Sequence, residues 1–220
     1  MDYNPFDYFD HIFCINLDER TDRWDECQIE FDKVGIKDRV ERFSAIKDGH
    51  GRKGCGQSHI SVLKLCKERG YKTPLILEDD VMFLDDTLDN LKKSLSEFKE
   101  YENWSMFYLG GTLNKKPWQK LDNLIITDFM ACLTAYSVNP LLYDYIIENT
   151  TEYFGNWSGR PIDDWYVIEI QDAYARKNEM YTFATTPLLV LQRPSFSDIE
   201  NYKTDYSAMQ MERYNRYMNE

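Results

Sequence analysis

Three consecutive carboxylates, Glu78, Asp79 and Asp80, are the residues in this sequence best suited to chemistry. They follow the apolar run 75–77, which Pro74 opens, and such a run is typical of a buried strand. Ionised carboxylates at the end of a buried strand need water, a cation or a metal to offset their desolvation. Ligands of open α/β sheets bind in the crevice beyond the carboxyl ends of the strands. We therefore expect a site there, and hard oxygen ligands of this kind suit Mn²⁺ or Mg²⁺.

A simpler interpretation is that the three acids form a polar turn before a helix, where negative charge is favourable. Apolar residues recur at intervals of three and four between residues 84 and 98, which predicts a helix beginning near Asp85 or Asp86. This later acidic pair already supplies the helix start. The earlier trio is therefore not needed for capping, although the simpler interpretation stays open.

Two further groups of charged residues are candidates for a site. Arg20 and Arg23 lie in a polar segment after the apolar run 11–17, where they can meet a nucleotide base or phosphate. The alternative is a pair of solvated surface arginines. Asp163 and Asp164 lie at the predicted start of a helix, and the simpler interpretation of this pair is an acidic N-cap.

The elements that must position these residues alternate between strands and helices, which predicts an α/β domain. We expect strands at 11–17, 40–46, 74–77, 106–109, 124–127, 132–138, 180–184 and 188–191. We expect helices at 24–34 (ended by Gly35), 58–69 (capped by Ser58 and ended by Gly70), from about 85 to 98, after Asn139 and Pro140, and around Trp165, Ile168 and Ala173. The glycine-rich stretch 47–56 is expected to be a flexible loop, and the polar stretch 112–120 a mobile loop over a site.

Composition limits the functions that the chain can have. Its 220 residues suffice for one core and no linker divides them, so we expect one domain over residues 1–199 and a Tyr- and Met-rich helical tail over 200–220. The net charge of −12, without clustered Lys and Arg, argues against nucleic acid as a partner. Five cysteines without paired spacing are expected to be reduced. No signal-peptide pattern or membrane-spanning run is seen, so we expect a cytoplasmic protein.

Several short motifs, in order along nearly the whole chain, resemble glycosyltransferase family 25. These motifs are residues 15–18 with Arg20 and Arg23, residues 42–45, 54–59, 75–81, 108–110 and 161–163, and Gln192 with residues 197–199. The resemblance implies a single GT-A (Rossmann-like) domain, with a mixed, mostly parallel central sheet flanked by helices. It also implies transfer of a hexose, commonly galactose, from a UDP-sugar, with inversion of configuration.

The resemblance further implies roles for individual residues. The residues that it implies for binding the donor are Asn16, Leu17, Arg20, Arg23, Ser58, Glu78, Asp79 and Gly110. A metal, Mn²⁺ or Mg²⁺, is assigned to Asp80 together with Glu78 and Gln192. Asp163 is the leading catalytic base and Asp164 its alternative, since here a second Asp follows the first. The expected acceptor is a glycan, a glycolipid or a protein. Whether the protein contacts a membrane surface, and its oligomeric state, are left open.

Two other functions remain as alternatives. One is a non-catalytic relative that binds a nucleotide sugar or serves as a scaffold. The other is a metal-dependent phosphohydrolase, since such enzymes also place acids after an apolar strand. Those hydrolases need a nucleophilic Asp in the first acidic position, where this chain has Glu78.

Overall fold

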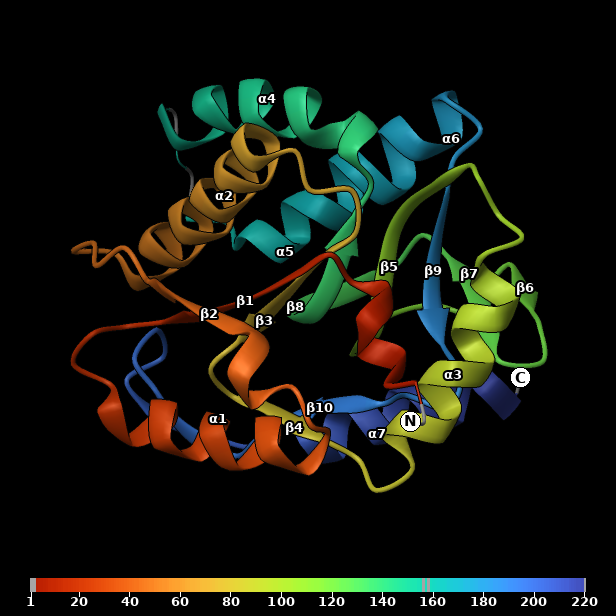
Figure 1. Cartoon of the computed structure of the whole chain (residues 1–220). Helices are drawn as coiled ribbons and strands as arrows, with labels where there is room; N and C mark the ends of the chain where they lie inside the picture. The colour runs from red at the N-terminus through yellow and green to blue at the C-terminus, as the bar shows by residue number, and fades with distance from the viewer. Residues whose placement is uncertain (1–2, 156, 158, 220) are drawn as a thin grey trace.

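A computed structural model describes residues 3–155, 157 and 159–219, and these residues build one eight-stranded central sheet (Figure 1). The predicted domain over 1–199 and tail over 200–220 include five residues that lie outside the described residues, namely 1, 2, 156, 158 and 220. In sheet order the strands are β2 (Val40–Ser44), β1 (His11–Asn16), β3 (Pro74–Glu78), β8 (Met130–Val138), β5 (Trp104–Leu113), β9 (Tyr181–Thr185), β7 (Leu124–Thr127) and β6 (Gln119–Lys120).

Six of these eight described strands point the same way, and only β8 and β7 run against them. Helices cover both faces of the sheet. The prediction of an α/β domain with a mixed, mostly parallel sheet flanked by helices is therefore confirmed, and this architecture is consistent with a GT-A-like fold.

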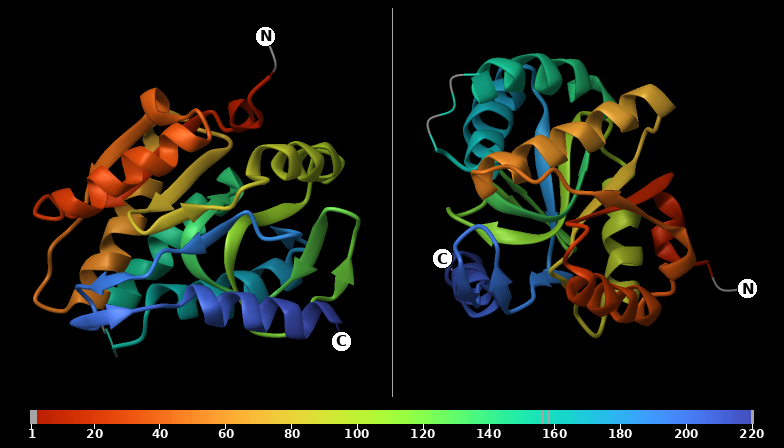
Figure 2. Two further views of the ribbon diagram at one scale, coloured as in Figure 1. Left: turned by 90° about the horizontal axis from the view of Figure 1, so that it is seen from below. Right: turned by 90° about the vertical axis from the view of Figure 1, so that its left-hand side faces the viewer.

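The two faces of the sheet carry separate apolar cores, as the alternation of side chains along the strands requires. In β1, Phe13 and Ile15 belong to one core, while Ile12 and Cys14 belong to the other. The first core is covered by α2 (Gly51–Arg69), α4 (Tyr143–Gly155), α5 (Ile162–Trp165), the π-helical segment η4 (Tyr166–Tyr174) and α6 (Ala175–Lys177); the second is covered by α1 (Thr21–Lys33) and α3 (Thr87–Phe98) (Figures 1 and 2).

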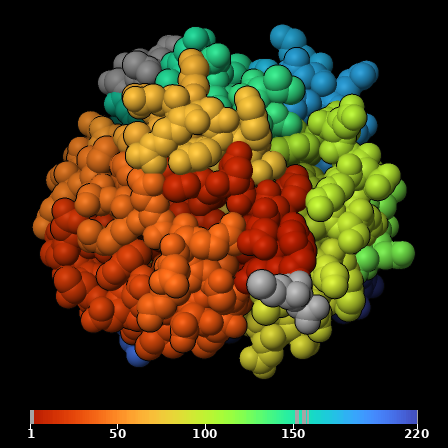
Figure 3. Space-filling view, in the orientation of Figure 1, coloured from red at the N-terminus to blue at the C-terminus, as the bar shows by residue number. Residues whose placement is uncertain are grey.

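Short turns and the amino-terminal segment lie beside the helices that cover the second core. The turn η1 (Pro5–Tyr8) packs against α3, where Tyr8 meets Phe98 edge to face with ring centroids 6.2 Å apart. The space-filling view shows this red segment between the gold residues of α2 and the yellow-green residues around α3 (Figure 3). Two further turns, η2 (Lys37–Arg39) and η3 (Pro140–Leu142), precede β2 and α4. Asn139 caps η3 by accepting a hydrogen bond from the Leu141 amide, as predicted.

Two small ribbons bring late segments of the chain beside the carboxylate trio. Strand β10 (Val190–Gln192) pairs antiparallel with β4 (Val81–Phe83) and places Gln192 opposite Val81. Strands β11 (Ser195–Ser197) and β12 (Tyr202–Thr204) form a hairpin directly after β10. The final helix α7 (Ser207–Asn219) packs along β5 (Figure 2), and Tyr214 hydrogen-bonds Thr186. The domain boundary at residue 199 stays a prediction.

The glycine-rich stretch 47–56 is the main departure from the predicted elements. Helix α2 already begins at Gly51, so Ser58 is not an N-cap but a fully buried residue inside the helix. Its hydroxyl donates to the Gly54 carbonyl at 2.7 Å and accepts from the Ile46 amide at 2.8 Å. A Cβ at Gly54 would lie 2.5 Å from the Ile46 carbonyl oxygen. The glycine therefore allows close packing of backbone rather than flexibility.

Two helices also differ from their predicted faces or bounds. Helix α1 begins at Thr21, three residues before the predicted start. The helix predicted around Trp165 was expected to bury Ile168 and Ala173. Ile168 is 42% exposed, and Ala173 is also exposed. It buries Val167 and Ile170 instead. The cause is the π-helical stretch, because its i→i+5 bonding shifts the buried face away from the 3.6-residue period. No described helix is long and apolar enough to cross a membrane.

Candidate active site

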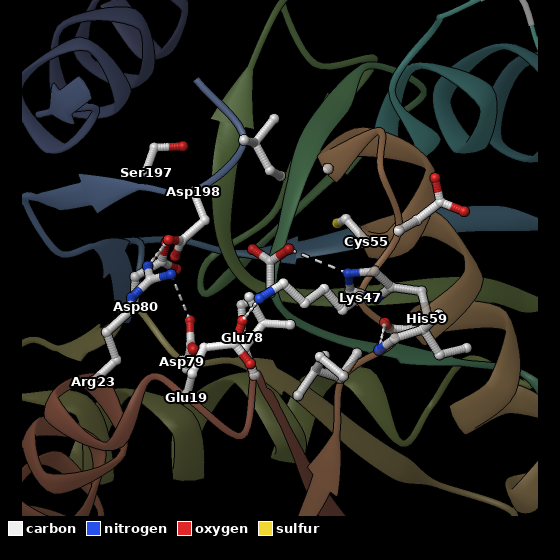
Figure 4. A pocket seen from close by; sticks show the side chains of 18 of the residues that line it. Glu19, Arg23, Lys47, Cys55, His59, Glu78, Asp79, Asp80, Ser197 and Asp198 are labelled. Atoms are coloured by element: carbon white, nitrogen blue, oxygen red, sulfur yellow. Dashed lines mark hydrogen bonds and ion pairs between the residues drawn. The ribbon is translucent and has the colours of Figure 1, made fainter. Parts of the chain in front are cut away.

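A pocket of about 380 Å³ opens beyond the carboxyl ends of β1, β2 and β3. The carboxylate trio lies in its wall, as the sequence predicts, and Figure 4 shows the labelled residues around it. In that view Arg23, Asp79 and Asp80 lie toward one end, Cys55 and His59 toward the other. This position is the crevice where open α/β sheets bind their ligands.

Arg23, on the first turn of α1, holds two of the three acids. Its Nη1 lies 2.8 Å from Asp79 Oδ1 and its Nη2 lies 2.6 Å from Asp80 Oδ2. All three side chains are only about a tenth exposed. Removing a guanidinium from such a group would leave buried carboxylates without a counter-ion, so the arginine is required for this arrangement.

Neutral groups hold the same two carboxylates from other sides. Asn16 Nδ2 donates to Asp79 Oδ2 at 2.7 Å, and Gln192 Nε2 donates to Asp80 Oδ2 at 2.9 Å. The Arg193 amide donates to the Asp80 carbonyl at 2.6 Å, which fixes the turn after β3. Within the described residues, Asp80 Oδ1 is buried and has no hydrogen-bond partner. One carboxylate oxygen is therefore left for a ligand.

The electrostatic environment raises the pKa values of these acids. Burial raises the pKa of Asp79 to about 6, and Arg23 opposes the shift. Burial also raises the pKa of Asp80, with Arg23 again opposing and Glu78 adding to the rise. Three carboxylates and one guanidinium leave this wall with two negative charges when all are ionised, which favours a divalent cation or a cationic ligand group.

A second pocket, of about 290 Å³, adjoins the first and shares Cys55, Glu78, Gln192 and Ile199 with it. We call the two the β3 pocket and the α5 pocket. Asp163, in the first turn of α5, lines the α5 pocket. The shared residues make the two pockets two parts of one site.

Asp163 is placed by an unusual backbone conformation. Its Oδ2 accepts from the Cys132 amide at 3.3 Å, and Cys132 has φ +63°, a left-handed value rare for residues other than glycine. Burial raises the pKa of Asp163, the neighbouring Asp164 raises it further, and the Cys132 amide opposes the rise. Strained residues of this kind concentrate at functional sites.

The β11–β12 hairpin forms the outer wall of the β3 pocket. Ser197, Asp198, Ile199 and Thr204 all line it. Arg20 forms ion pairs with Asp22 on α1 and Asp198 on the hairpin, and Arg52 at the start of α2 forms an ion pair with Glu200 at 2.7 Å. The hairpin is thus tied to both helices that border the pocket.

The structure brings most of the predicted site residues together. Leu17, Arg23, Ser58, Glu78, Asp79, Asp80 and Gln192 line the β3 pocket, and Asp163 lines the α5 pocket. Asn16 lies behind Asp79, and Arg20 lies at the hairpin.

Three predictions find less support in this geometry. Gly110 lines neither pocket, because it lies beneath β10, where a Cβ would be 2.0 Å from the Val190 carbonyl oxygen. Asp164 is exposed and lines neither pocket. The stretch 112–120 was predicted to lie over the site. Its first residues belong to β5, inside the sheet, its last belong to the edge strand β6, and none of its residues lines either pocket.

From the sequence, Cys55, Lys47 and His59 had not been assigned a role in the site. Lys47 lines the β3 pocket and forms an ion pair with Glu19. Cys55 and His59 are four residues apart on α2 and face the same pocket, beside Glu78. The spacing of Cys55 and His59 within the motif 54–59 could have revealed this, since residues four apart lie on one face of a helix. The glycines of the motif had suggested a loop instead.

A divalent metal fits this wall on two observations. Asp80 offers a buried carboxylate oxygen without a partner, and the wall carries excess negative charge. Glu78 and Gln192 lie within the same pocket and supply oxygen atoms. Such hard donors suit Mg²⁺ or Mn²⁺ rather than softer ions.

Comparisons with known proteins agree with the motifs in the sequence. The model of glycosyltransferase family 25 (LPS biosynthesis protein) matches residues 48–140. Procollagen galactosyltransferase 2 of Homo sapiens is 26% identical over 225 residues, which cover 83% of this chain and 35% of that protein. A glycosyltransferase 25 family member of Drosophila melanogaster is 26% identical over 46% of this chain and 21% of its own length.

The chain thus spans about a third of the human relative, which carries further sequence outside the match. A solved glycosyltransferase involved in glycosylation of the major capsid of PBCV-1 superposes with a TM-score of 0.48 and 14% identity, over 73% of this chain and 74% of that one. This likeness is too limited to bear on activity. The family model, the curated relatives and the ordered motifs agree, and the chain is related to glycosyltransferase family 25.

Proposed function

We propose that the protein transfers a hexose from a UDP-sugar to a hydroxyl group of a glycan, glycolipid or protein, with inversion of configuration. One observation carries the proposal: two adjoining pockets share Glu78 and Gln192, and each contains the groups that one substrate needs. The β3 pocket would bind the donor. The α5 pocket would bind the acceptor.

Size and charge support the donor assignment. A volume of about 380 Å³ lies within the usual range for small-molecule sites, about 300–1,000 Å³. Arg23 and Lys47 provide positive charge in a wall that is otherwise acidic. A diphosphate would be repelled by the three carboxylates unless a cation lay between them.

Asp80, with Glu78 and Gln192, would hold that cation. When bound, Mn²⁺ or Mg²⁺ neutralises the charge that develops on the departing diphosphate. Arg23 keeps Asp79 and Asp80 in place, and Asn16 and Gln192 orient their oxygens.

The transfer step uses a carboxylate of the α5 pocket. The acceptor oxygen forms a bond to the sugar C1 as the bond from C1 to the phosphate oxygen breaks, and Asp163 takes the hydroxyl proton. Its raised pKa makes Asp163 a stronger base than an ordinary carboxylate. An acceptor that enters from the adjoining pocket attacks C1 on the side away from the diphosphate, which gives inversion.

The identity of the sugar rests on the relatives alone. Procollagen galactosyltransferase 2 of both Homo sapiens and Mus musculus is named for galactosyl transfer. UDP-galactose is therefore the first donor to test.

The test of the base compares Asp163→Asn with Asp164→Asn, which make the same charge change on neighbouring residues. Loss of a positioned base costs about 10²–10⁴-fold in rate. We expect that loss in acceptor-dependent transfer by Asp163→Asn and less than about tenfold by Asp164→Asn, since Asp164 lines neither pocket. Equal losses in both variants, or a larger loss in Asp164→Asn, would contradict the assignment.

The test of the cation compares Asp80→Ala with Asp85→Ala, an exposed acid that precedes α3. Release of UDP should require added Mn²⁺ or Mg²⁺, stop with chelator, and fail in Asp80→Ala only. Donor turnover that is indifferent to chelator would remove the metal from the proposal while leaving the transfer reaction intact.

A further inference from the structure

Cys55, His59 and Glu78 form a cluster of potential metal ligands that the transfer reaction does not use as a set. One ligand atom from each residue lies within 4.8 Å of the other two. His59 Nε2 is 3.1 Å from Glu78 Oε1, and Cys55 lies one helical turn before His59 on α2. The cluster occupies the wall between the β3 pocket and the α5 pocket.

We propose that Cys55, His59 and Glu78 bind one borderline-soft divalent cation of the zinc class, at a site that shares only Glu78 with the all-oxygen site proposed at Asp80. Sulfur and imidazole ligands favour Zn²⁺ and Co²⁺, whereas Mn²⁺ and Mg²⁺ favour oxygen. The chain therefore presents two cation sites of different chemistry in adjoining parts of one cleft.

The geometry suits a tetrahedral ion with an open position. Bonds of about 2.3 Å to sulfur and 2.0–2.2 Å to nitrogen and oxygen place tetrahedral ligands roughly 3.3–3.7 Å apart. Ligand atoms within 4.8 Å reach those separations by side-chain movements on the order of 1 Å. Three protein ligands leave a fourth position, which faces the pockets and can take water or a substrate oxygen.

The imidazole is already oriented for such a role. His59 is 1% exposed, and its Nδ1 lies 2.9 Å from the Tyr136 hydroxyl, a fully buried group. Metal-bound histidines usually engage a partner through their second ring nitrogen, which fixes the ring and the tautomer. Tyr136 supplies that partner and leaves Nε2 for the ion. On binding, the Cys55 thiol gives up its proton to solvent, since the thiolate is the ligand.

Occupancy of this site has a consequence for the reaction. Glu78 belongs both to the zinc-class site and to the wall of the donor pocket. A cation held by Cys55 and His59 would engage Glu78 and withdraw it from the cation proposed at Asp80. We therefore expect Zn²⁺ to inhibit sugar transfer, and Cys55→Ser to relieve that inhibition.

The test is a titration of the reduced protein with Co²⁺ in the absence of donor, so that it does not depend on the proposed activity. Thiolate coordination gives a charge-transfer absorption in the near ultraviolet. We expect this band to saturate at a single equivalent of Co²⁺ and to disappear when Zn²⁺ is added. Cys55→Ser should abolish the band, and Tyr136→Phe should weaken Co²⁺ binding by about 10–100-fold.

Cys132→Ser is the matched control, because Cys132 lines the α5 pocket but is not one of the three ligands. It should keep the band at full affinity. Protection of Cys55 from alkylation by bound Co²⁺, located by mass spectrometry in the unmodified protein, gives a second measurement that needs no variant. Absence of the band, its survival in Cys55→Ser, or its loss in Cys132→Ser would overturn the proposal.

Discussion

Replacement of Arg23 by Met tests whether the carboxylate wall depends on the Arg23 guanidinium. The change keeps an unbranched apolar side chain and removes the charge that lies 2.8 Å from Asp79 and 2.6 Å from Asp80. Loss of one partner from a buried ion pair costs about 3–5 kcal/mol, because the remaining charge stays buried without compensation. For a chain of this size we expect the melting temperature to fall by about 6–20 °C.

Arg20→Met is the matched control on the same segment. Arg20 also bridges two acids, but the side chains of Asp22 and Asp198 are 65% and 37% exposed. Solvent screens such pairs, and each contributes less than about 1 kcal/mol to the free energy of unfolding. Arg20→Met should therefore lower the melting temperature by only a few degrees.

The sign of the pH dependence follows from the raised pKa values. Burial places the pKa of Asp79 at about 6 in the folded protein, above its ordinary value of 3.8. An acid with a higher pKa in the folded state stabilises folding below its unfolded pKa, and that contribution is lost as the pH rises through the folded pKa. Without Arg23, the pKa values of Asp79 and Asp80 rise further, so the deficit of Arg23→Met should be large at pH 7.5 and smaller at pH 5.

Thermal unfolding followed by circular dichroism at both pH values measures these effects. We expect Arg23→Met to lower the melting temperature more than Arg20→Met does, and we expect this difference to shrink at pH 5. An Arg23→Met protein as stable as Arg20→Met, or one whose deficit grows toward pH 5, would refute it.

Two further predictions concern backbone conformation. Gly110→Ala places a Cβ about 2.0 Å from the Val190 carbonyl oxygen and should lower the free energy of unfolding in urea by about 1–3 kcal/mol. The control Gly49→Ala, whose Cβ would have no atom within 4 Å, should stay within about 0.5 kcal/mol of the parent. Equal effects of the two variants would show that β10 does not constrain Gly110. Cys132→Gly should be more stable than Cys132→Ala by about 1–2 kcal/mol, because φ at this position is +63°. A more stable Ala variant would mean that the left-handed conformation carries no strain. The contact of the Cys132 amide with Asp163 would then need another explanation.

The sequence predicted the centre of the site because the local signals there were consistent. An apolar run followed by three acids fixed both strand β3 and its polar end, and the spacing of leucines fixed the start of α3 within two residues. The approach of Asp163 to the same cleft came only from the family resemblance. No local pattern places residue 163 beside residue 78.

The parts that the sequence did not reveal depend on contacts between distant residues. Strand β8 inserts antiparallel between β3 and β5, a sheet order that no single strand encodes. Gly54 and Gly110 suggested loop flexibility or donor contact, whereas each allows close approach to the backbone of another segment. Because α2 begins at Gly51, Cys55 and His59 share a helix face that was not apparent from the glycine-rich motif.

Donor turnover by the unmodified protein tests the central proposal most directly. UDP and GDP release should be measured across a panel of nucleotide sugars, with Mn²⁺, with Mg²⁺ and with chelator, in the presence and absence of sugar and peptide acceptors. We predict metal-dependent release of UDP from one UDP-hexose, with UDP-galactose the first to examine. Failure of every nucleotide sugar to bind the protein, measured by calorimetry in the same buffers, would contradict the proposal.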